Sequence, residues 1–181
     1  MEHFYNDIQG WFRNESFYDN IVKSLPHDAH IVEVGAWKGR STSYLIVNVI
    51  NSGKNIKVDV VDTWLGSNEE EHRDDPEIFN LYDVFTKNLN AVKDHYTPIR
   101  LSSIKASKLY EDNSLDFVFI DASHEKKDVI DDINHWLPKL KVGGVLAGDD
   151  LPWEGVRQAA NETLKEFNEF EGGLVWFYVK K

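Results

Sequence analysis

The chain contains no cysteine among its 181 residues. This absence excludes disulfide bonds, thiolate zinc sites, cysteine nucleophiles and iron–sulfur clusters held by cysteine. Long apolar runs are also missing, since none reaches the roughly 18 residues that indicate a membrane span. Residues 1–14 mix polar and aromatic side chains and lack the basic start and apolar middle of a secretion signal. We therefore expect a cytoplasmic protein that has no membrane partner.

Positive charge is scarce in this sequence. There are 20 Lys and Arg residues against 31 Asp and Glu residues, which gives a net charge of −11. The basic residues are scattered and form no stripe, and a negative field repels phosphate backbones. We therefore expect no nucleic-acid partner and predict a small-molecule substrate. The sequence is compatible with a homo-oligomer.

Repeats, low-complexity tracts and flexible linkers are absent as well. The length of the chain suits one domain, which can bury roughly 70% of its unfolded surface without disulfide bonds. We predict a single domain over residues 1–181. Residues 1–28 are expected to form a helical extension, and residues 29–181 are expected to form the core.

Short apolar runs alternate with stretches of helical periodicity from residue 29 onward. The predicted strands are His30–Val34, Ile56–Val61, Pro98–Leu101, Leu115–Ile120, Gly143–Ala147 and Leu174–Val179, the last in a hairpin with Phe170 through Gly172-Gly173. The predicted helices are Gly39–Asn51, Glu77–Val92, Ser103–Tyr110, Glu125–Leu137 and Trp153–Phe167, after amphipathic stretches at His3–Phe12 and Glu15–Leu25. The polar stretch Leu65–Pro76 predicts a loop.

Strands that alternate with helices indicate an α/β fold with a mostly parallel sheet. We expect a Rossmann-like, doubly wound, seven-stranded sheet that has helices on both faces and an antiparallel hairpin at its C-terminal edge. In such sheets, ligands bind outside the carboxyl ends of the strands. Three predicted strands end next to aspartate and the first ends next to Glu33, so we expect the functional site at this edge.

A glycine loop follows the first predicted strand. Gly35 and Gly39 flank a turn into a helix, with Ala36 and Trp37 between them. Glycine lets the backbone approach a ligand, and the start of a helix offers free N–H groups. An unpaired Glu33 carboxylate would be costly at the end of a buried strand, and a cationic ligand could stabilise it. The loop alone fits a ligand site and a tight turn, with Glu33 capping nearby backbone, equally well.

Two further residues are candidates for cofactor contact. Asp62 ends the second strand and precedes Thr63. A carboxylate there can accept both hydroxyls of a ribose, or it can cap the following loop. Ser103 lies after the third strand. It can cap its helix or contact an adenine edge, and capping is the commoner role.

Three carboxylates end two neighbouring strands. Asp121 follows one strand, Asp149 and Asp150 follow the next, and His124 lies shortly after Asp121. Like charges at close range raise one another's pKa, and a divalent cation such as Mg²⁺ would compensate with its preference for carboxylate oxygens. Histidine titrates near neutral pH, which suits a general base. The alternative is a solvated turn, with His124 capping the next helix. The carboxylates gather where the fold places ligands, which favours a site.

These patterns together resemble class I methyltransferases. The resemblance runs from about Ile31 to the C-terminus. It rests on the Glu-x-Gly-x-x-x-Gly loop, the acid at the second strand end and Phe119-Ile120-Asp121-Ala122-Ser123-His124. A longer stretch resembles small-domain methyltransferases that include metal-dependent O-methyltransferases of macrolide sugars. That stretch comprises Asp121, Asp128, Asp132, Trp136, Pro138, Gly143-Gly144 and Gly148-Asp149-Asp150, and Val61-Asp62-Thr63-Trp64 and Gly155-Val156-Arg157 also fit.

The resemblance implies an S-adenosylmethionine-dependent O-methyltransferase that uses Mg²⁺ or another divalent cation and a small hydroxylated substrate. Asp121, Asp149 and Asp150 match the metal ligands, and the implied catalytic residues are Asp121 and the general base His124. The implied cofactor-binding residues are Glu33, Gly35, Ala36, Trp37, Gly39, Asp62, Thr63, Ser103 and Asp121. From position alone, Trp64 and the loop Leu65–Pro76 are predicted to cover the site.

Two other functions remain open on the sequence. A nicotinamide-dependent oxidoreductase uses a similar sheet, but its loop has the spacing Gly-x-Gly-x-x-Gly, and Glu33 would repel a pyrophosphate. A non-catalytic S-adenosylmethionine-binding module would keep the pocket without transferring a methyl group. The presence of His124 and three carboxylates argues against such a module.

Overall fold

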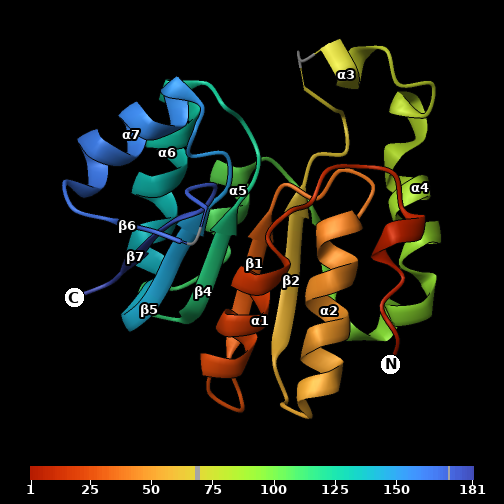
Figure 1. Cartoon of the computed structure of the whole chain (residues 1–181), viewed down its shortest axis with the longest axis horizontal. Helices are drawn as coiled ribbons and strands as arrows, with labels where there is room; N and C mark the ends of the chain where they lie inside the picture. Colours follow the sequence, from red (N-terminus) through yellow and green to blue (C-terminus); the bar gives the residue numbers. More distant parts are fainter. Residues whose placement is uncertain (68–69, 171) are drawn as a thin grey trace.

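The strands of the chain form one sheet, and helices lie on both of its faces (Figure 1). This computed structural model describes residues 1–67, 70–170 and 172–181. The strands are β1 His30–Val34, β2 Lys57–Asp62, β3 Thr97–Arg100, β4 Leu115–Ile120, β5 Leu140–Gly148, β6 Asn168–Glu169 and β7 Trp176–Val179. The α-helices are α1 Glu15–Ser24, α2 Arg40–Ser52, α3 Glu70–Arg73, α4 Leu81–Asn88, α5 Ser103–Ser107, α6 Lys126–Trp136 and α7 Glu154–Leu164. Short 3-10 helices are η1 Tyr5–Asp7, η2 Ile78–Asn80, η3 Asn90–His95 and η4 Leu137–Lys139.

The strand order is β3-β2-β1-β4-β5-β7-β6, which confirms the predicted doubly wound, seven-stranded α/β fold. Strands β1 to β5 pair in parallel, whereas β7 pairs antiparallel with β5 and β6. The chain builds outward from β1 in one direction through β3, and then returns to the other side of β1 with β4. The crevice between the carboxyl ends of β1 and β4 is therefore the switch point at which such sheets bind ligands.

Successive residues of the central strands pack on opposite faces of the sheet. In β1, Ile31 belongs to the core that α1, α2 and α4 complete. Val32 and Val34 belong to the core that α5, α6 and α7 complete. These three side chains are at most 1% exposed. Burial on both faces explains why the parallel strands appear in the sequence as short, continuous apolar runs.

The region between β2 and β3 differs from the prediction. A single helix over Glu77–Val92 is wrong, because the structure divides this range into η2, α4 and η3. Asparagine side chains compete with helical backbone hydrogen bonds, and Asn88 at the end of α4 donates from Nδ2 to the backbone oxygen of Lys38 at 2.9 Å. The predicted loop Leu65–Pro76 contains the short helix α3, and its residues 68 and 69 lie outside the described residues.

The predicted C-terminal hairpin is confirmed by the pairing of β6 with β7. Strand β7 begins at Trp176, two residues later than predicted, and residue 171 lies outside the described residues. Only η1 forms within the predicted amphipathic stretch His3–Phe12, and α5 ends at Ser107 instead of Tyr110. Within the part of the chain that the structure describes, every helix is too short or too polar to cross a bilayer.

Candidate functional site

A cavity of about 570 Å³ opens at the carboxyl ends of the parallel strands, at the switch point between β1 and β4. This volume is within the range of small-molecule and cofactor sites. The sequence-predicted residues that line the cavity are Gly35, Ala36, Trp37, Asp62, Thr63, Ser103, Asp121, His124, Asp149 and Asp150. The sheet therefore brings most of the predicted site together, as the position of the strand ends requires.

The glycine loop lies against the end of β4. Gly35 has a φ of 89°, and its N–H donates to the backbone oxygen of Val61 at 2.8 Å. A Cβ atom on this residue would lie 1.7 Å from the backbone oxygen of Asp121. No side chain fits in that space, so Gly35 allows β1 and β4 to close around the floor of the cavity.

Asp62 fixes the position of the glycine loop. Its Oδ2 accepts the N–H of Ala36 at 2.8 Å and that of Trp37 at 3.0 Å, and its Oδ1 accepts the N–H of Trp64 at 2.7 Å. The carboxylate therefore caps loop backbone, which was one of its two predicted roles. Asp62 also lines the cavity, and its contact with ribose hydroxyls stays a prediction.

Two of the predicted cofactor-binding residues are not among those that line the cavity, namely Glu33 and Gly39. Glu33 is 0% exposed and accepts hydrogen bonds from Tyr18 Oη at 2.8 Å and from Thr42 Oγ1. Burial raises the pKa of Glu33, although these hydroxyls oppose the shift. Hydroxyls from α1 and α2, rather than a cationic ligand, thus satisfy this carboxylate. Gly39 precedes α2 as its N-cap with a φ of 90°.

Ser103 belongs to a partly buried chain of polar groups. Its hydroxyl donates to Asp132 and accepts the Nε1–H of Trp136 at 2.8 Å. The N-cap of α5 is Ser102, so the predicted capping role of Ser103 is wrong. Burial raises the pKa of Asp132 to about 6, and the nearby carboxylates Asp128 and Asp131 add to the shift. Contact between Ser103 and adenine stays a prediction.

The raised pKa of Asp132 predicts a pH-dependent stability. The folded state holds the proton of the Asp132 carboxyl group more tightly than the unfolded chain does. The protonated carboxyl group therefore contributes to the free energy of unfolding fully below about pH 3.9, and this contribution is lost as pH rises to about 6. The loss amounts to about 3 kcal/mol at most. We expect Asp132→Asn to exceed the wild type in free energy of unfolding at pH 8 and to match it more closely at pH 4.5, as measured by urea titration.

The matched control for this experiment is Asp131→Asn. Asp131 lies on the same helix, but its side chain is 44% exposed and lies near Lys127. We expect this variant to keep the pH dependence of the wild type. The same pH dependence in Asp132→Asn and the wild type would contradict the assignment to Asp132.

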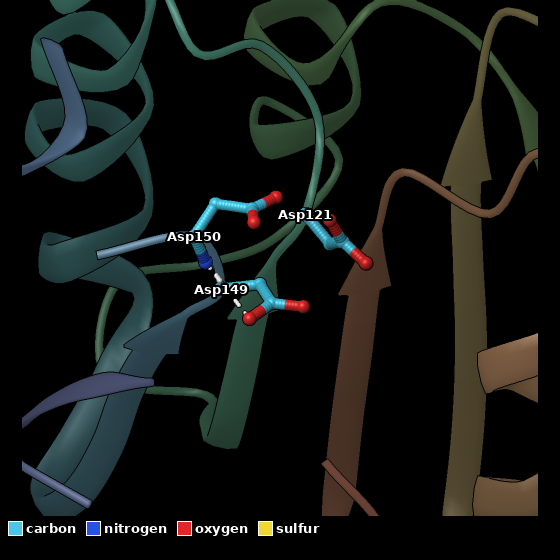
Figure 2. Close-up of side chains that lie close together, drawn as sticks. All are labelled: Asp121, Asp149 and Asp150. Atoms are coloured by element: carbon cyan, nitrogen blue, oxygen red, sulfur yellow. Dashed lines mark hydrogen bonds between the residues drawn. The ribbon is translucent and has the colours of Figure 1, made fainter. Parts of the chain in front are cut away.

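Asp121, Asp149 and Asp150 come together at the ends of β4 and β5 (Figure 2). One carboxylate oxygen from each lies within 4.8 Å of the others. Burial raises the pKa of Asp121 well above its usual range, and the charges of Asp149 and Asp150 raise it further. Burial also raises the pKa of Asp149 to about 6. No Lys or Arg among the described residues pairs with these carboxylates, and the basic group beside them is His124, whose Nε2 lies 2.7 Å from Asp150 Oδ2.

Asp149 is also tied to the N-terminal part of the chain. Its Oδ2 accepts Asn14 Nδ2 at 2.6 Å, and its Oδ1 accepts the backbone N–H of Asp150 at 2.8 Å. Asn14 is 3% exposed and precedes α1. This contact brings the residues just before α1 next to the acidic cluster.

His124 lies beside the same cluster. Its Nε2 is 2.7 Å from Asp150 Oδ2, and its ring stacks on Trp153 with a centroid distance of 4.5 Å and an interplanar angle of 15°. The start of α7 approaches closely, since a Cβ atom on Gly155 would lie 2.3 Å from the backbone oxygen of His124. The imidazole orientation is therefore set by Asp150 on its edge and by Trp153 on its face.

The sequence did not indicate that residues 10–13 line the cavity. Gly10, Trp11, Phe12 and Arg13 all contribute to its wall. This stretch overlaps the end of the predicted amphipathic stretch His3–Phe12, and it lies before the part that resembles known methyltransferases. The only signal in the sequence was its pair of adjacent aromatic residues beside an arginine.

Lys38 connects three segments around the cavity. Its side chain is 1% exposed, and its ammonium group donates to Gln9 Oε1, Asp75 Oδ2 and Glu77 Oε2, each at 2.7 Å. Burial alone would lower the pKa of Lys38, but the two carboxylates outweigh it and raise the pKa. The glycine loop thus anchors both the N-terminal stretch and the residues that follow α3.

Trp64 and the loop Leu65–Pro76 were predicted to cover the site, and the structure places the two differently. Within Leu65–Pro76, residues Gly66, Ser67 and His72 line the cavity, and His72 stacks on Trp37 with a centroid distance of 3.8 Å. Trp64 is instead 2% exposed, and its Nε1 donates to the backbone oxygen of Trp37 at 3.1 Å. Trp64 therefore supports the glycine loop from within the core instead of covering the cavity.

Comparison with known proteins bears on the fold and the family. A family model described as a methyltransferase domain matches residues 32–151. No curated protein sequence matches the chain. The solved structure of the O-methyltransferase NovP is similar, with a TM-score of 0.68 and 14% identity, over 93% of this chain and 79% of that chain. An O-methyltransferase from Bacillus cereus in complex with SAH gives a TM-score of 0.64 and 17% identity, over 95% and 83%.

TrmN from Thermus thermophilus shares the fold as well, with a TM-score of 0.60 and 13% identity, over 92% of this chain and 48% of TrmN. At these identities, the structural likeness establishes the fold. The family match spans more than half of the chain and includes the glycine loop, Asp62 and all three carboxylates of the acidic cluster. The chain therefore belongs to the family of class I, S-adenosylmethionine-dependent methyltransferases.

Proposed function

We propose that the protein transfers the methyl group of S-adenosylmethionine to a hydroxyl oxygen of a small substrate, with the help of a divalent metal ion such as Mg²⁺. The observation that carries this proposal is the position of Asp121. This residue lines the cavity at the switch point and also belongs to the three-carboxylate cluster. A hard cation held there would prefer oxygen ligands, which favours a hydroxylated acceptor.

The cofactor is proposed to extend along the ends of three strands. Asp62 at the end of β2 would accept the ribose hydroxyls, and Ser103 lies where the adenine would reach. Gly35 and Asp121, at the ends of β1 and β4, would flank the methionine part. The family match and the cavity wall support this arrangement. Because residues 10–13 belong to that wall, we also propose that residues 1–28 and 29–181 act as one domain.

The acidic cluster has the donor set of a divalent cation site. Asp121, Asp149 and Asp150 would hold the ion through carboxylate oxygens, which are the ligands that Mg²⁺ prefers. The raised pKa values of Asp121 and Asp149 are consistent with buried carboxylates whose charge His124 only partly offsets. When bound, the ion would orient acceptor oxygens and lower the pKa of a hydroxyl group.

His124 is proposed to take up the proton of the acceptor hydroxyl. Asp150, 2.7 Å from Nε2, would stabilise the imidazolium that forms. The acceptor oxygen forms its bond to the methyl carbon as the carbon–sulfur bond breaks, which yields a methyl ether and S-adenosylhomocysteine. The sulfonium group is already activated, so the contribution of the protein is mainly to position the reactants.

A direct test is the release of S-adenosylhomocysteine from S-adenosylmethionine, Mg²⁺ and a panel of small diols. We expect turnover with at least one diol and its loss in the presence of EDTA. Turnover that EDTA leaves unchanged would contradict the metal role. Cofactor binding without any turnover would instead support a non-catalytic module. The nicotinamide-dependent alternative gains no support from the family match.

A further inference from the structure

Arg13 and Arg40 both line the cavity, and the proposed reaction uses neither of these arginines. We propose that Arg13 binds an anionic group on the acceptor, and that the acceptor is a planar, hydroxylated aromatic compound bearing a carboxylate or a comparable anion. This inference rests on the proposed methyl transfer and names the substrate class of the same site.

The position of Arg13 places it at the acceptor end of the cavity. The next residue, Asn14, donates to Asp149 at 2.6 Å, and Asp149 ends β5 beside the proposed metal ligands. In the strand order, β5 lies on the far side of β4 from β2, where Asp62 would hold the ribose. Arg13 therefore directly precedes Asn14, the residue that contacts the proposed metal ligand Asp149.

The guanidinium of Arg13 is available to a ligand. Its side chain lines the cavity and is exposed, and no described residue forms an ion pair or a hydrogen bond with it. Arg157, in contrast, pairs with Glu169 at 2.8 Å. Arg13 makes no such pair with the acidic cluster, although that cluster lines the same cavity. A structural role in neutralising the cluster therefore does not explain this residue.

The backbone around Arg13 is held on both sides. Gln9 accepts a hydrogen bond from Lys38, and the backbone oxygen of Ile8 accepts one from Arg40 Nη1 at 3.0 Å. Asn14 is anchored to Asp149 on the other side. Anchoring at both ends limits the ordering cost when a ligand binds. A fixed backbone therefore presents the arginine to the cavity.

The cofactor has a carboxylate of its own, and a second arginine of the cavity wall lies next to the glycine loop. Arg40 follows the glycine loop as the first residue of α2 and lines the cavity. Its Nε–H is buried and has no hydrogen-bond partner among the described residues. Gly10 packs against it, since a Cβ atom there would lie 3.6 Å from Arg40 Cβ. Arg40 Nη1 and Nη2 already donate to Ile8 O at 3.0 Å and to Asn6 Oδ1 at 3.2 Å. Because Arg40 directly follows the glycine loop, the cofactor carboxylate is assigned to the Arg40 side of the cavity and the acceptor anion to Arg13.

The planar character of the acceptor follows from the aromatic side chains of the wall. Trp153 is 54% exposed, lines the cavity and is already stacked with His124, the proposed base. Phe12 also lines the cavity beside Arg13. Aromatic side chains bind planar rings by offset stacking or edge-to-face contact. A flat ring could therefore contact Trp153 or Phe12 while its hydroxyl groups reach His124 and the acidic cluster.

The test compares two probes that differ in one charge, 3,4-dihydroxybenzoate and its methyl ester. Their affinities for the protein loaded with S-adenosylhomocysteine and Mg²⁺ are measured by calorimetry. We expect the acid to bind the wild type about 10- to 100-fold more tightly than the ester, as for a charge-assisted contact. In Arg13→Gln this ratio should approach one, and Arg13→Lys should recover part of it. Lys23→Gln, an exposed charge change on α1, should keep the wild-type ratio.

Separate outcomes would overturn the inference and the proposed function. Equal binding of acid and ester by the wild type, or no binding of either, would overturn the inference. A loss of S-adenosylhomocysteine affinity in Arg13→Gln with an unchanged acid-to-ester ratio would assign Arg13 to the cofactor carboxylate instead. Tighter binding of D-glucuronate than of 3,4-dihydroxybenzoate would overturn the planar class. Failure of the wild type to bind S-adenosylhomocysteine would contradict the proposed function itself.

Discussion

Asp149→Ala is expected to abolish metal-stimulated turnover, with a loss of at least about 100-fold, while binding of S-adenosylmethionine survives. Even residues that only orient metal ligands contribute about 10- to 100-fold, and Asp149 is a proposed ligand. It lies at the end of β5, two strands away from β1 and the glycine loop, so the ribose and adenine contacts should remain. The measurements are S-adenosylhomocysteine release as a function of Mg²⁺ and cofactor affinity by calorimetry.

Asp131→Ala is the control for the removal of a carboxylate. Asp131 lies on α6, is half-exposed and is not part of the acidic cluster. Its replacement should leave the Mg²⁺ dependence of turnover as it is in the wild type. Undiminished metal-stimulated turnover in Asp149→Ala would refute the metal role, and a parallel loss of cofactor affinity would indicate a more general disruption of the site.

Gly35→Ala should lose cofactor binding and be destabilised by more than about 4 kcal/mol, which is at the upper end for a single substitution. The added Cβ would lie 1.7 Å from the backbone oxygen of Asp121, so the loop or the end of β4 must move. The φ of 89° adds a smaller strain, since an alanine rarely adopts this conformation. Denaturant unfolding and calorimetry with S-adenosylhomocysteine measure the two effects.

Gly143→Ala is the control that separates the strain of a positive φ from the steric clash of an added Cβ atom. Gly143 has a similar φ of 83°, but a Cβ atom added there would meet none of the described atoms within 4 Å. We expect this variant to be destabilised by only about 1–2 kcal/mol, the cost of the left-handed conformation alone. It should also keep its cofactor affinity. Similar losses in the two variants would show that the close approach of β1 and β4 is not what requires glycine at position 35.

The fold could be predicted because its strands carry a strong local signal. Runs such as Leu115–Ile120 are buried on both faces, and the structure reproduces this strand and His30–Val34 at the predicted bounds. The prediction of a single helix over Glu77–Val92 was wrong because of a tertiary contact. The apolar spacing of this stretch is helical, but Asn88 is recruited by the backbone of Lys38, and such a contact across the fold leaves no periodicity in the sequence.

The part of the candidate site that lies at the carboxyl ends of the strands could be predicted from the sequence. Asp121 and Asp149 follow adjacent parallel strands, so topology alone brings them together. Glu33 shows the limit of this reasoning, since Tyr18 and Thr42 reach it from two helices, and no pattern in the sequence pairs them. Arg13 shows the same limit, because tertiary contacts such as those of Asn14 with Asp149 and of Lys38 with Gln9 hold its segment at the cavity.

The hydrogen bond from the Asp121 N–H to the backbone oxygen of Val34, 2.7 Å long, joins the first strand to the fourth. This closure brings together parts of the chain that are remote in sequence, and contacts of that kind form late because of their loop-closure cost. Cofactor affinity should therefore appear only after β4 has docked on β1 during refolding. A bound cofactor favours the closed state over partly folded states, so the cofactor should stabilise the fold as well as supply the methyl group.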